Sequence, residues 1–259
     1  YPAMLAERDR LRDAGMMAGI GIAACLEPSG GNSSFEPLLN QSNQTSTWME
    51  SCQVNIDALG KVTARIHTTS SGQGHETLVS TVLGEVMQID PELIRITRPN
   101  SLESLPGNSP VGSRMAIMLG GAAARAGEKL KAKIMAIAAH RLGVAIDQLR
   151  YEGGDVLAHD GRQFTWDEMV ELAHRQYHNL PDGMDPGLAS FDIMQVPTGD
   201  ALPVDDKVQM YPCYSFEFHL LLVSFDPIIG RPDIHSYVIG HDCGTVINPA
   251  IVSGMTYGG

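Results

Sequence analysis

The sequence lacks several features that define common classes of protein, and each absence excludes a class. No apolar run approaches the roughly 20 residues that a membrane helix needs, and the longest candidate, Phe216 to Phe225, is interrupted by Glu217 and His219. Its four cysteines lie far apart without a Cys-x-x-Cys pair, so neither a zinc knuckle nor a disulfide scaffold is indicated. We therefore expect no membrane partner and a reducing, cytoplasmic location, with Cys25 and Cys52 as small core residues.

Positive charge is also scarce. The chain has 18 Lys and Arg residues against 30 Asp and Glu residues, a formal net charge of −12. The densest basic stretch, Arg125 to Lys133, spaces its cations around Glu128 as a solvated helix face does. A phosphate backbone would be repelled, and we expect no nucleic-acid partner.

Motifs for hydrolysis and for metal binding are missing as well. No Gly-x-Ser-x-Gly elbow or paired acidic motif is present. Glu171, His174 and His178 would share one side of a helix, but no Glu directly follows the first His, and Pro181 ends the helix at once. Consecutive residues of a strand point to alternate faces, so His241 to Cys243 cannot all bind one ion. We predict no metal ligands.

What is present is a globular α+β pattern. With 259 residues, of which 43% are hydrophobic, the chain forms one large domain or two small ones, and we expect two α+β subdomains at about 17–140 and 141–259. Because the chain starts without Met and stops at Gly258-Gly259, we expect a fragment or a processed subunit. Periodicity predicts helices over 3–14, 75–88, 114–141 and 166–177, and strands over 19–26, 47–57, 61–69, 93–97, 150–158, 214–225 and 233–241.

A glycine-rich turn, Gly72-Gln73-Gly74-His75-Glu76-Thr77, connects a predicted strand to a predicted helix. Its glycines allow backbone N–H groups to approach a ligand closely, and the helix N-terminus carries partial positive charge. The turn is neither a Walker A loop nor a Gly-x-Gly-x-x-Gly fingerprint, because position 77 is Thr. We expect an anionic ligand here, and a purely structural turn is the alternative.

Two further segments are candidates. Asn108 to Arg114 is a second glycine-containing loop before a helix, and both loops could converge on one phosphate-bearing ligand. Alternatively, Ser109 or Ser113 simply caps that helix. At the end of the last strand, Asp242 is a candidate acceptor for a ligand or for a backbone N–H group.

The order of these motifs resembles the large subunit of molybdenum hydroxylases, the family of xanthine dehydrogenase, aldehyde oxidase and aerobic carbon monoxide dehydrogenase. The resemblance runs from about Gly19 to Gly259, and the Gly-Gln-Gly-His turn together with the Asp-x-Gly-x-x-x-Asn-Pro ending is a specific pair. It rests on Gly19-Ile20-Gly21-Ile22-Ala23, Gly60-Lys61-Val62, the Gly72 to Thr77 turn, Gly112-Ser113-Arg114 before an Ala-rich helix, and His241-Asp242-Cys243-Gly244 to Asn248-Pro249.

The resemblance implies an α+β fold of mixed sheets with packed helices, the molybdopterin-binding domain of the xanthine dehydrogenase type. It implies that Gln73, Gly74 and His75 contact the pterin or its diphosphate. Gly112, Ser113 and Arg114 would then lie beside the cofactor, and Asp242 would hold its far end. The implied reaction hydroxylates an aldehyde, a heteroaromatic carbon or a comparable small substrate with oxygen from water.

The resemblance also implies partners. These are the N-terminal half of the molybdenum subunit, and iron–sulfur clusters and FAD on other domains or chains; a likeness to the carbon monoxide dehydrogenase branch favours the cytosine dinucleotide of molybdopterin. The family's active-site glutamate lies beyond the end of this chain, so no catalytic residue is assigned and the isolated chain is expected to be inactive. The substrate and the oligomeric state stay open.

One departure favours a different interpretation. After Asn248-Pro249 the family usually has Gly-Gln, whereas this sequence has Gly254-Met255. Met cannot supply the amide that would pair with a pterin edge. A noncatalytic binding or assembly module that keeps the fold without the cofactor is therefore the alternative. An unrelated enzyme for phosphorylated small molecules, which would rest on the glycine-rich turn alone, is a third.

Overall fold

The computed structural model describes residues 1–30, 49–98, 100, 102–108, 110–195, 205 and 211–258. The chain forms two compact units: Tyr1–Ser29 with Cys213–Gly259, and Gly30–Pro212. These units do not follow the division expected near residue 140. The reason is a long-range strand pairing, since the strand after the first helix pairs with a strand that begins at residue 213.

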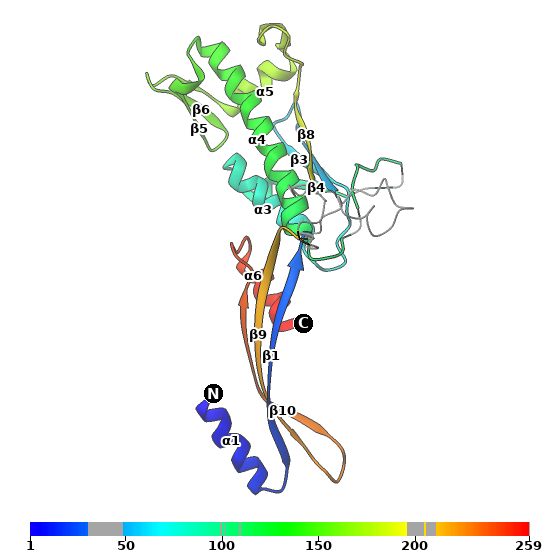
Figure 1. Ribbon diagram of the computed structural model, residues 1–259. Coiled ribbons are helices and arrows are strands. Elements are labelled where there is room, and N and C mark those ends of the chain that lie inside the picture. Colours follow the sequence, from blue (N-terminus) through cyan, green and yellow to red (C-terminus); the bar gives the residue numbers. More distant parts are fainter. Residues whose placement is uncertain are drawn as a thin grey trace. The chain divides into compact units, whose positions relative to one another are not determined.

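The first unit is built on a three-stranded antiparallel sheet of order β1-β9-β10 (Figure 1). Met4 and Leu11 of α1 are buried against Ala18 and Leu222 and form a small core at one end of the sheet. Its elements are α1 (Pro2–Asp13), β1 (Met17–Ser29), β9 (Cys213–Phe225), β10 (Pro232–Asp242) and α6 (Pro249–Gly258).

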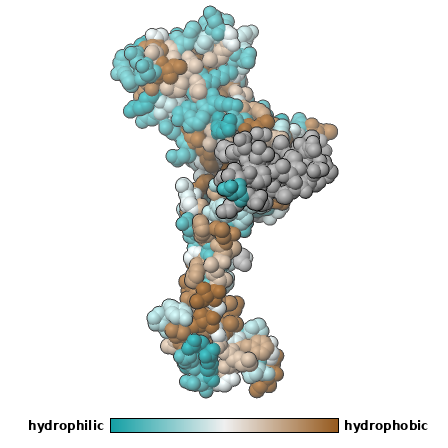
Figure 2. All heavy atoms as spheres, in the orientation of Figure 1, coloured by the Kyte–Doolittle hydropathy of each residue, from teal (hydrophilic) through white to brown (hydrophobic). Residues whose placement is uncertain are grey.

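The same face of this sheet is uncovered beyond α1. The strand register places Ile22, Leu26, Phe216, Phe218 and Val238 on this face, and each is between 51% and 59% exposed. Figure 2 shows hydrophobic surface gathered over the strands of this unit. A monomer rarely leaves such a contiguous apolar surface in water. We call these five residues the open apolar face.

The second unit combines a four-stranded mixed sheet of order β4-β3-β2-β8 with a small three-stranded sheet of order β5-β6-β7. Short 3₁₀ turns cover 91–93, 146–148 and 177–179. The main elements are β2 (Met49–Ile56), β3 (Val62–Ile66), α3 (His75–Met87), β4 (Ile94–Thr97), α4 (Met115–Leu142), β5 (Leu149–Glu152), β6 (Asp155–Ala158), β7 (Gln163–Phe164), α5 (Trp166–His174) and β8 (Leu188–Gln195).

The main core lies between one face of the four-stranded sheet and the helices α3 and α4 (Figure 1). Alternate residues of β2 and β3 are fully or almost fully buried, as expected for a sheet covered on one side. The β3-α3-β4 segment is a parallel strand–helix–strand unit. The carboxyl end of β3 therefore leads directly to the N-terminus of α3, the usual place for a ligand in such units.

The α+β fold class is confirmed, and the predicted helices and most predicted strands are present within a few residues of their expected bounds. Three details differ. The stretch 150–158 is a hairpin of two strands turned at Gly153-Gly154 rather than one strand. The short β7 and the whole of β8 were not predicted. Among the described residues, no helix is long and apolar enough to cross a membrane.

The cysteines separate into two environments, which gives a labelling prediction. Cys52 is completely buried on β2, and burial raises the pKa of its thiol to about 12. Cys25, expected in the core, is exposed, as are Cys213 and Cys243. Iodoacetamide is expected to label these three in the folded protein and to reach Cys52 only after unfolding, because the thiolate is the nucleophile. Peptide mass spectrometry checks this, and rapid native labelling of Cys52 would contradict the structure.

Candidate functional site

The predicted glycine-rich turn lies at the carboxyl end of β3 and contains the N-terminus of α3. Gly74 is the N-cap residue in the left-handed conformation, with φ 73°, and it supplies no side-chain cap. A helix start leaves its first backbone N–H groups without partners inside the helix. The first N–H groups of α3, from His75 onward, therefore lie at an uncapped end with partial positive charge.

The rest of the turn is stabilised by its own side chains. Ser70 Oγ accepts hydrogen bonds from the backbone N–H groups of Gly72 (3.3 Å) and Gly74 (3.0 Å). Gln73 Oε1 accepts one from Ser71 N–H at 2.6 Å, while the Gln73 residue is exposed. A Cβ placed on Gly72 would meet no atom within 4 Å, so open space lies beside the turn. The conformation is fixed, and the space beside it can accept a ligand.

His75, the first residue of α3, is only 3% exposed. Its Nδ1 is buried without a hydrogen-bond partner among the described residues. Burial lowers the pKa of the imidazole, an effect that the carboxylates of Glu76 and Glu50 oppose. A buried polar atom without a partner is rare in folded proteins and fits a ligand that would supply the missing bond.

The lowered pKa of His75 makes folding depend on pH. The folded state takes up this proton less readily than the unfolded chain. The contribution of neutral His75 to the free energy of unfolding is therefore fully present above about pH 6.5, and it declines as the pH falls through that value towards the folded pKa. We expect His75→Gln to reduce the acid-side slope of unfolding free energy by at most about 1.4 kcal/mol per pH unit. Urea titrations at several pH values test this. The exposed His140→Gln is the matched control, and equal slopes for both variants would contradict the assignment.

The second loop also leads into a helix, α4. Gly112 and Ser113 both have positive φ values, 69° and 47°. Such a conformation is strained for Ser and is typical of functional loops. The N-cap residue of α4 is Arg114, whose side chain makes no capping hydrogen bond. Ser113 directly precedes this N-cap residue, and Ser109 lies outside the described residues.

Arg114 does not point its charge into open space. Its side chain is completely buried and forms an ion pair with the equally buried Glu50 on β2. Glu50 Oε1 also accepts a hydrogen bond from the backbone N–H of Asn108 at 3.1 Å. Glu50 was not predicted as a site residue. The available signal was an acidic residue two positions before Cys52, on the face of β2 that carries the core residues.

The helices α3 and α4 run parallel, which brings the two loops to one end of the unit. A Cβ on Gly120 would lie 3.6 Å from Leu78, and one on Gly127 would lie 2.9 Å from Val86. Contacts therefore advance along both helices in the same direction, and glycines allow the close approach. The predicted convergence of the Gly72 to Thr77 turn and the Gly112 to Arg114 loop is supported, with both helix N-termini on the same side.

Asp242 belongs to the other unit, at the end of β10. The residue is exposed, and its Oδ1 accepts a hydrogen bond from Gly244 N–H at 2.9 Å. The segment thus forms the expected turn before α6, whose start is capped by Asn248 Oδ1. In the described part of the chain, no group of three His, Cys, Asp or Glu residues is placed to hold a metal ion.

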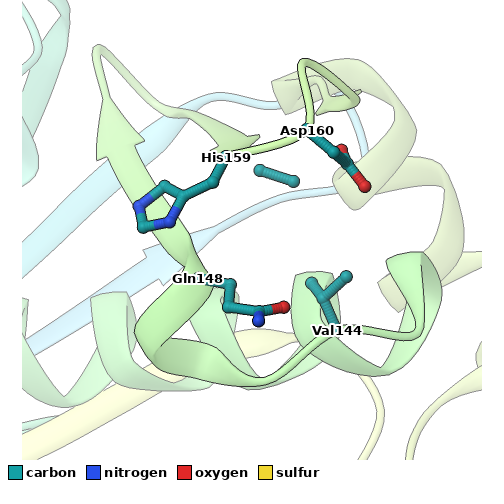
Figure 3. A pocket seen from close by; sticks show the side chains of 5 residues that line it. Val144, Gln148, His159 and Asp160 are labelled. Carbon is teal, nitrogen blue, oxygen red and sulfur yellow. The ribbon is translucent and has the colours of Figure 1, made fainter.

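A hollow of about 320 Å³ lies away from these loops, near the C-terminal end of α4 (Figure 3). It is lined by Val144, Gln148, Ala158, His159 and Asp160. His159 and Asp160 are exposed, and the Asp160 carboxylate is already paired with Arg162 at 2.7 Å. This hollow contains no predicted site residue, and its one carboxylate is engaged, so we assign it no function.

Comparison with known proteins identifies the family. All 259 residues match the molybdopterin cofactor-binding domain family. The chain belongs to this family. The chain is 28% identical over 261 residues to the nicotine 6-hydroxylase large subunit of Paenarthrobacter nicotinovorans, covering all of this chain and 30% of that protein. It is 29% identical over 263 residues to the carbon monoxide dehydrogenase large chain of Hydrogenophaga pseudoflava, with the same coverage.

Solved structures agree with this assignment. The Cu,Mo-containing carbon monoxide dehydrogenase superposes with a TM-score of 0.80 at 27% identity, covering 100% of this chain and 31% of that one. Quinoline 2-oxidoreductase from Pseudomonas putida 86 has the same fold, with a TM-score of 0.80 at 24% identity over 99% of this chain and 31% of its own. The chain thus spans about 30% of the length of the curated relatives. The resemblance to molybdenum hydroxylase large subunits is confirmed.

Proposed function

We propose that this chain is the C-terminal molybdopterin-binding region of a larger molybdenum hydroxylase subunit, which oxidises an aldehyde, a heteroaromatic ring or a similar small substrate. The observation that carries the proposal is the pair of parallel helices, α3 and α4, that begin on the same side of a chain belonging to the molybdopterin cofactor-binding family. Two aligned helix N-termini attract an anionic group such as the diphosphate of a pterin dinucleotide.

The residues present fit this group. Gly74, whose own N–H is bonded to Ser70 Oγ, would allow close approach of the diphosphate. His75 would offer its backbone N–H, and its buried Nδ1 would gain a partner. Gln73 would exchange its internal hydrogen bond with Ser71 for one to the cofactor. Gly112 and Ser113 would line the space beside the start of α4. Asp242 would hold the far end of the cofactor, and the cytosine dinucleotide is the form that we favour.

When bound, the molybdenum cofactor supplies two-electron oxidation of the substrate with oxygen derived from water. This chain would contribute binding and orientation of the cofactor, and we assign it no catalytic residue. Electrons would leave through iron–sulfur clusters and FAD on partner domains or chains. The four cysteines are all unpaired, which suits a reducing, cytoplasmic compartment.

We propose that the remaining part of the molybdenum subunit covers the open apolar face defined above. Phe218→Ser is expected to reduce self-association and dye binding by the isolated chain, because it removes a large exposed ring from the centre of that face. Sedimentation and fluorescence of a hydrophobic dye measure the effect. Leu59→Ser, at an isolated exposed leucine that is 75% accessible, is the control. Equal effects of the two substitutions would show that this face has no special role.

The proposed function is tested by composition. The chain is isolated from its native source together with the proteins that copurify, and molybdenum and oxidised pterin are measured per chain. We expect near-stoichiometric molybdenum and pterin, with iron-rich partner chains. A pure chain without molybdenum and pterin would overturn the proposal.

That second result would favour a noncatalytic binding or assembly module. The observation in favour of this alternative is Met255, which stands where the family usually has Gln and is 61% exposed on α6. If the alternative holds, substitutions at Gln73 and His75 would change only stability.

A further inference from the structure

Glu50 and Arg114 form a buried ion pair that has no role in the cofactor contacts proposed above. Both side chains are completely inaccessible to solvent, and they connect the start of β2 with the N-cap residue of α4, 64 residues later. Glu50 lies on the core face of the sheet, two residues before the fully buried Cys52. A carboxylate in this position requires a reason, because removing it from water is costly.

The pair fixes the loop that leads into α4 at two points. Glu50 Oε1 receives both the Arg114 guanidinium and the backbone N–H of Asn108. Asn108 returns the contact, since its Oδ1 accepts a hydrogen bond from Met49 N–H at 3.2 Å. The start of β2 is thus bonded to both the middle and the end of the loop.

Neighbouring contacts press the same loop against the sheet. Ser51 Oγ donates to the carbonyl of Pro106, and His67 Nδ1 lies 2.7 Å from the carbonyl oxygen of Leu105. A Cβ on Gly107 would lie only 2.4 Å from the His67 ring, so glycine is needed for this approach. These contacts hold the loop in one packed conformation. The carboxylate of Glu50 anchors the end of the loop nearest α4.

Stability alone does not explain the pair. Replacing a buried ion pair with apolar residues of similar volume is often neutral or stabilising, whereas removing one partner is costly. The other carboxylate buried between the sheet and α4, Asp192 on β8, differs in kind, because its partners Arg125 and Lys129 are 58% and 57% exposed. The complete burial of the Glu50–Arg114 pair therefore indicates that it positions the loop before α4.

We propose that Glu50 is a positioning residue that, through Arg114 and Asn108, holds the start of α4 level with the start of α3 so that both face one anionic ligand. This inference rests on the proposed function, because the ligand is the cofactor proposed above. It also assigns Arg114 a positioning role rather than direct contact, since its guanidinium is directed to Glu50. The charge of Glu50 acts on His75 as well, which connects the two loops electrostatically.

The test compares two variants of the full chain. The double variant Glu50→Met/Arg114→Met removes both buried charges at similar volume. Asp192→Asn is the matched control on the neighbouring strand β8, where Asp192 is opposite Cys52. Three quantities are measured: the thermal midpoint, hydrogen–deuterium exchange of residues 102–116, and molybdenum and pterin per chain in the complex from the native host.

We expect the double variant to stay folded while its loop exchanges about tenfold faster or more. Its molybdenum and pterin content should fall about tenfold, as when a group that orients a metal ligand is removed. Asp192→Asn should change neither quantity. Wild-type exchange and wild-type molybdenum in the double variant would overturn the inference.

Two further outcomes are separable. If the wild-type chain itself lacks molybdenum and pterin, the proposed function fails, and the exchange of residues 102–116 still decides whether Glu50 positions the loop. If the double variant does not fold, Glu50→Gln replaces it, because glutamine still accepts the Asn108 N–H bond. Wild-type loop exchange and molybdenum content in folded Glu50→Gln would then overturn the inference.

Discussion

Arg114→Met is expected to lower the free energy of unfolding by about 3–5 kcal/mol, because it removes one partner of a completely buried ion pair. The substitution leaves the Glu50 carboxylate buried without its counter-charge, since both side chains are completely inaccessible. Denaturant unfolding followed by circular dichroism measures the change.

A matched substitution separates burial from charge. Arg125 pairs with Asp192 at 3.1 Å, but its side chain is 58% exposed. Arg125→Met is therefore expected to cost less than about 1 kcal/mol. Combining Arg114→Met with Glu50→Met should recover most of the lost stability, because neither charge is then buried alone. A small effect of Arg114→Met by itself would contradict the buried ion pair.

Gly74→Val is expected to abolish retention of molybdopterin, with molybdenum content falling about tenfold or more. Gly74 adopts a φ of 73°, which a β-branched residue strongly disfavours. We also expect this side chain to hinder the approach of the diphosphate to the N-terminus of α3. Molybdenum and pterin are measured on the complex isolated with its partner chains.

Gly143 provides the control for backbone strain. It ends α4 with a φ of 65°, and a Cβ there would meet no atom within 4 Å. Gly143→Val therefore imposes the same conformational strain at the far end of α4, away from both loops. We expect reduced stability with normal molybdenum content. Equal loss of molybdenum in both variants would show that Gly74→Val acts through general destabilisation and not through a cofactor contact.

Local elements were predictable where residue chemistry dictates backbone conformation. Gly60 ends the turn between β2 and β3 with a φ of 75°, a conformation that glycine adopts readily. The Ala-rich helix predicted over 114–141 is α4, and its glycines Gly120 and Gly127 pack closely against α3. The glycine-rich turn was located correctly because only glycine readily adopts the φ observed at Gly74.

Long-range features were not predictable in this way. The pairing of β1 with β9 connects segments about 200 residues apart, and no local pattern specifies such a partner. β8 was missed because its polar positions include Asp192, which is buried by a tertiary ion pair. Glu50 was missed for the same reason, since an acidic residue in a strand is normally assigned to the solvent face. The candidate site residues could therefore be proposed from the turn motifs in the sequence. The residue that positions them, Glu50, was found only in the structure.

The most direct test of the central claim is hydrogen–deuterium exchange on the cofactor-containing complex compared with the same complex after removal of the cofactor. We predict that binding protects the first backbone N–H groups of α3, from His75 to Thr77, and those of α4, from Met115 onward, because these helix starts would hold the anionic part of the cofactor. Unchanged exchange at both helix starts, with protection elsewhere in the chain, would contradict it.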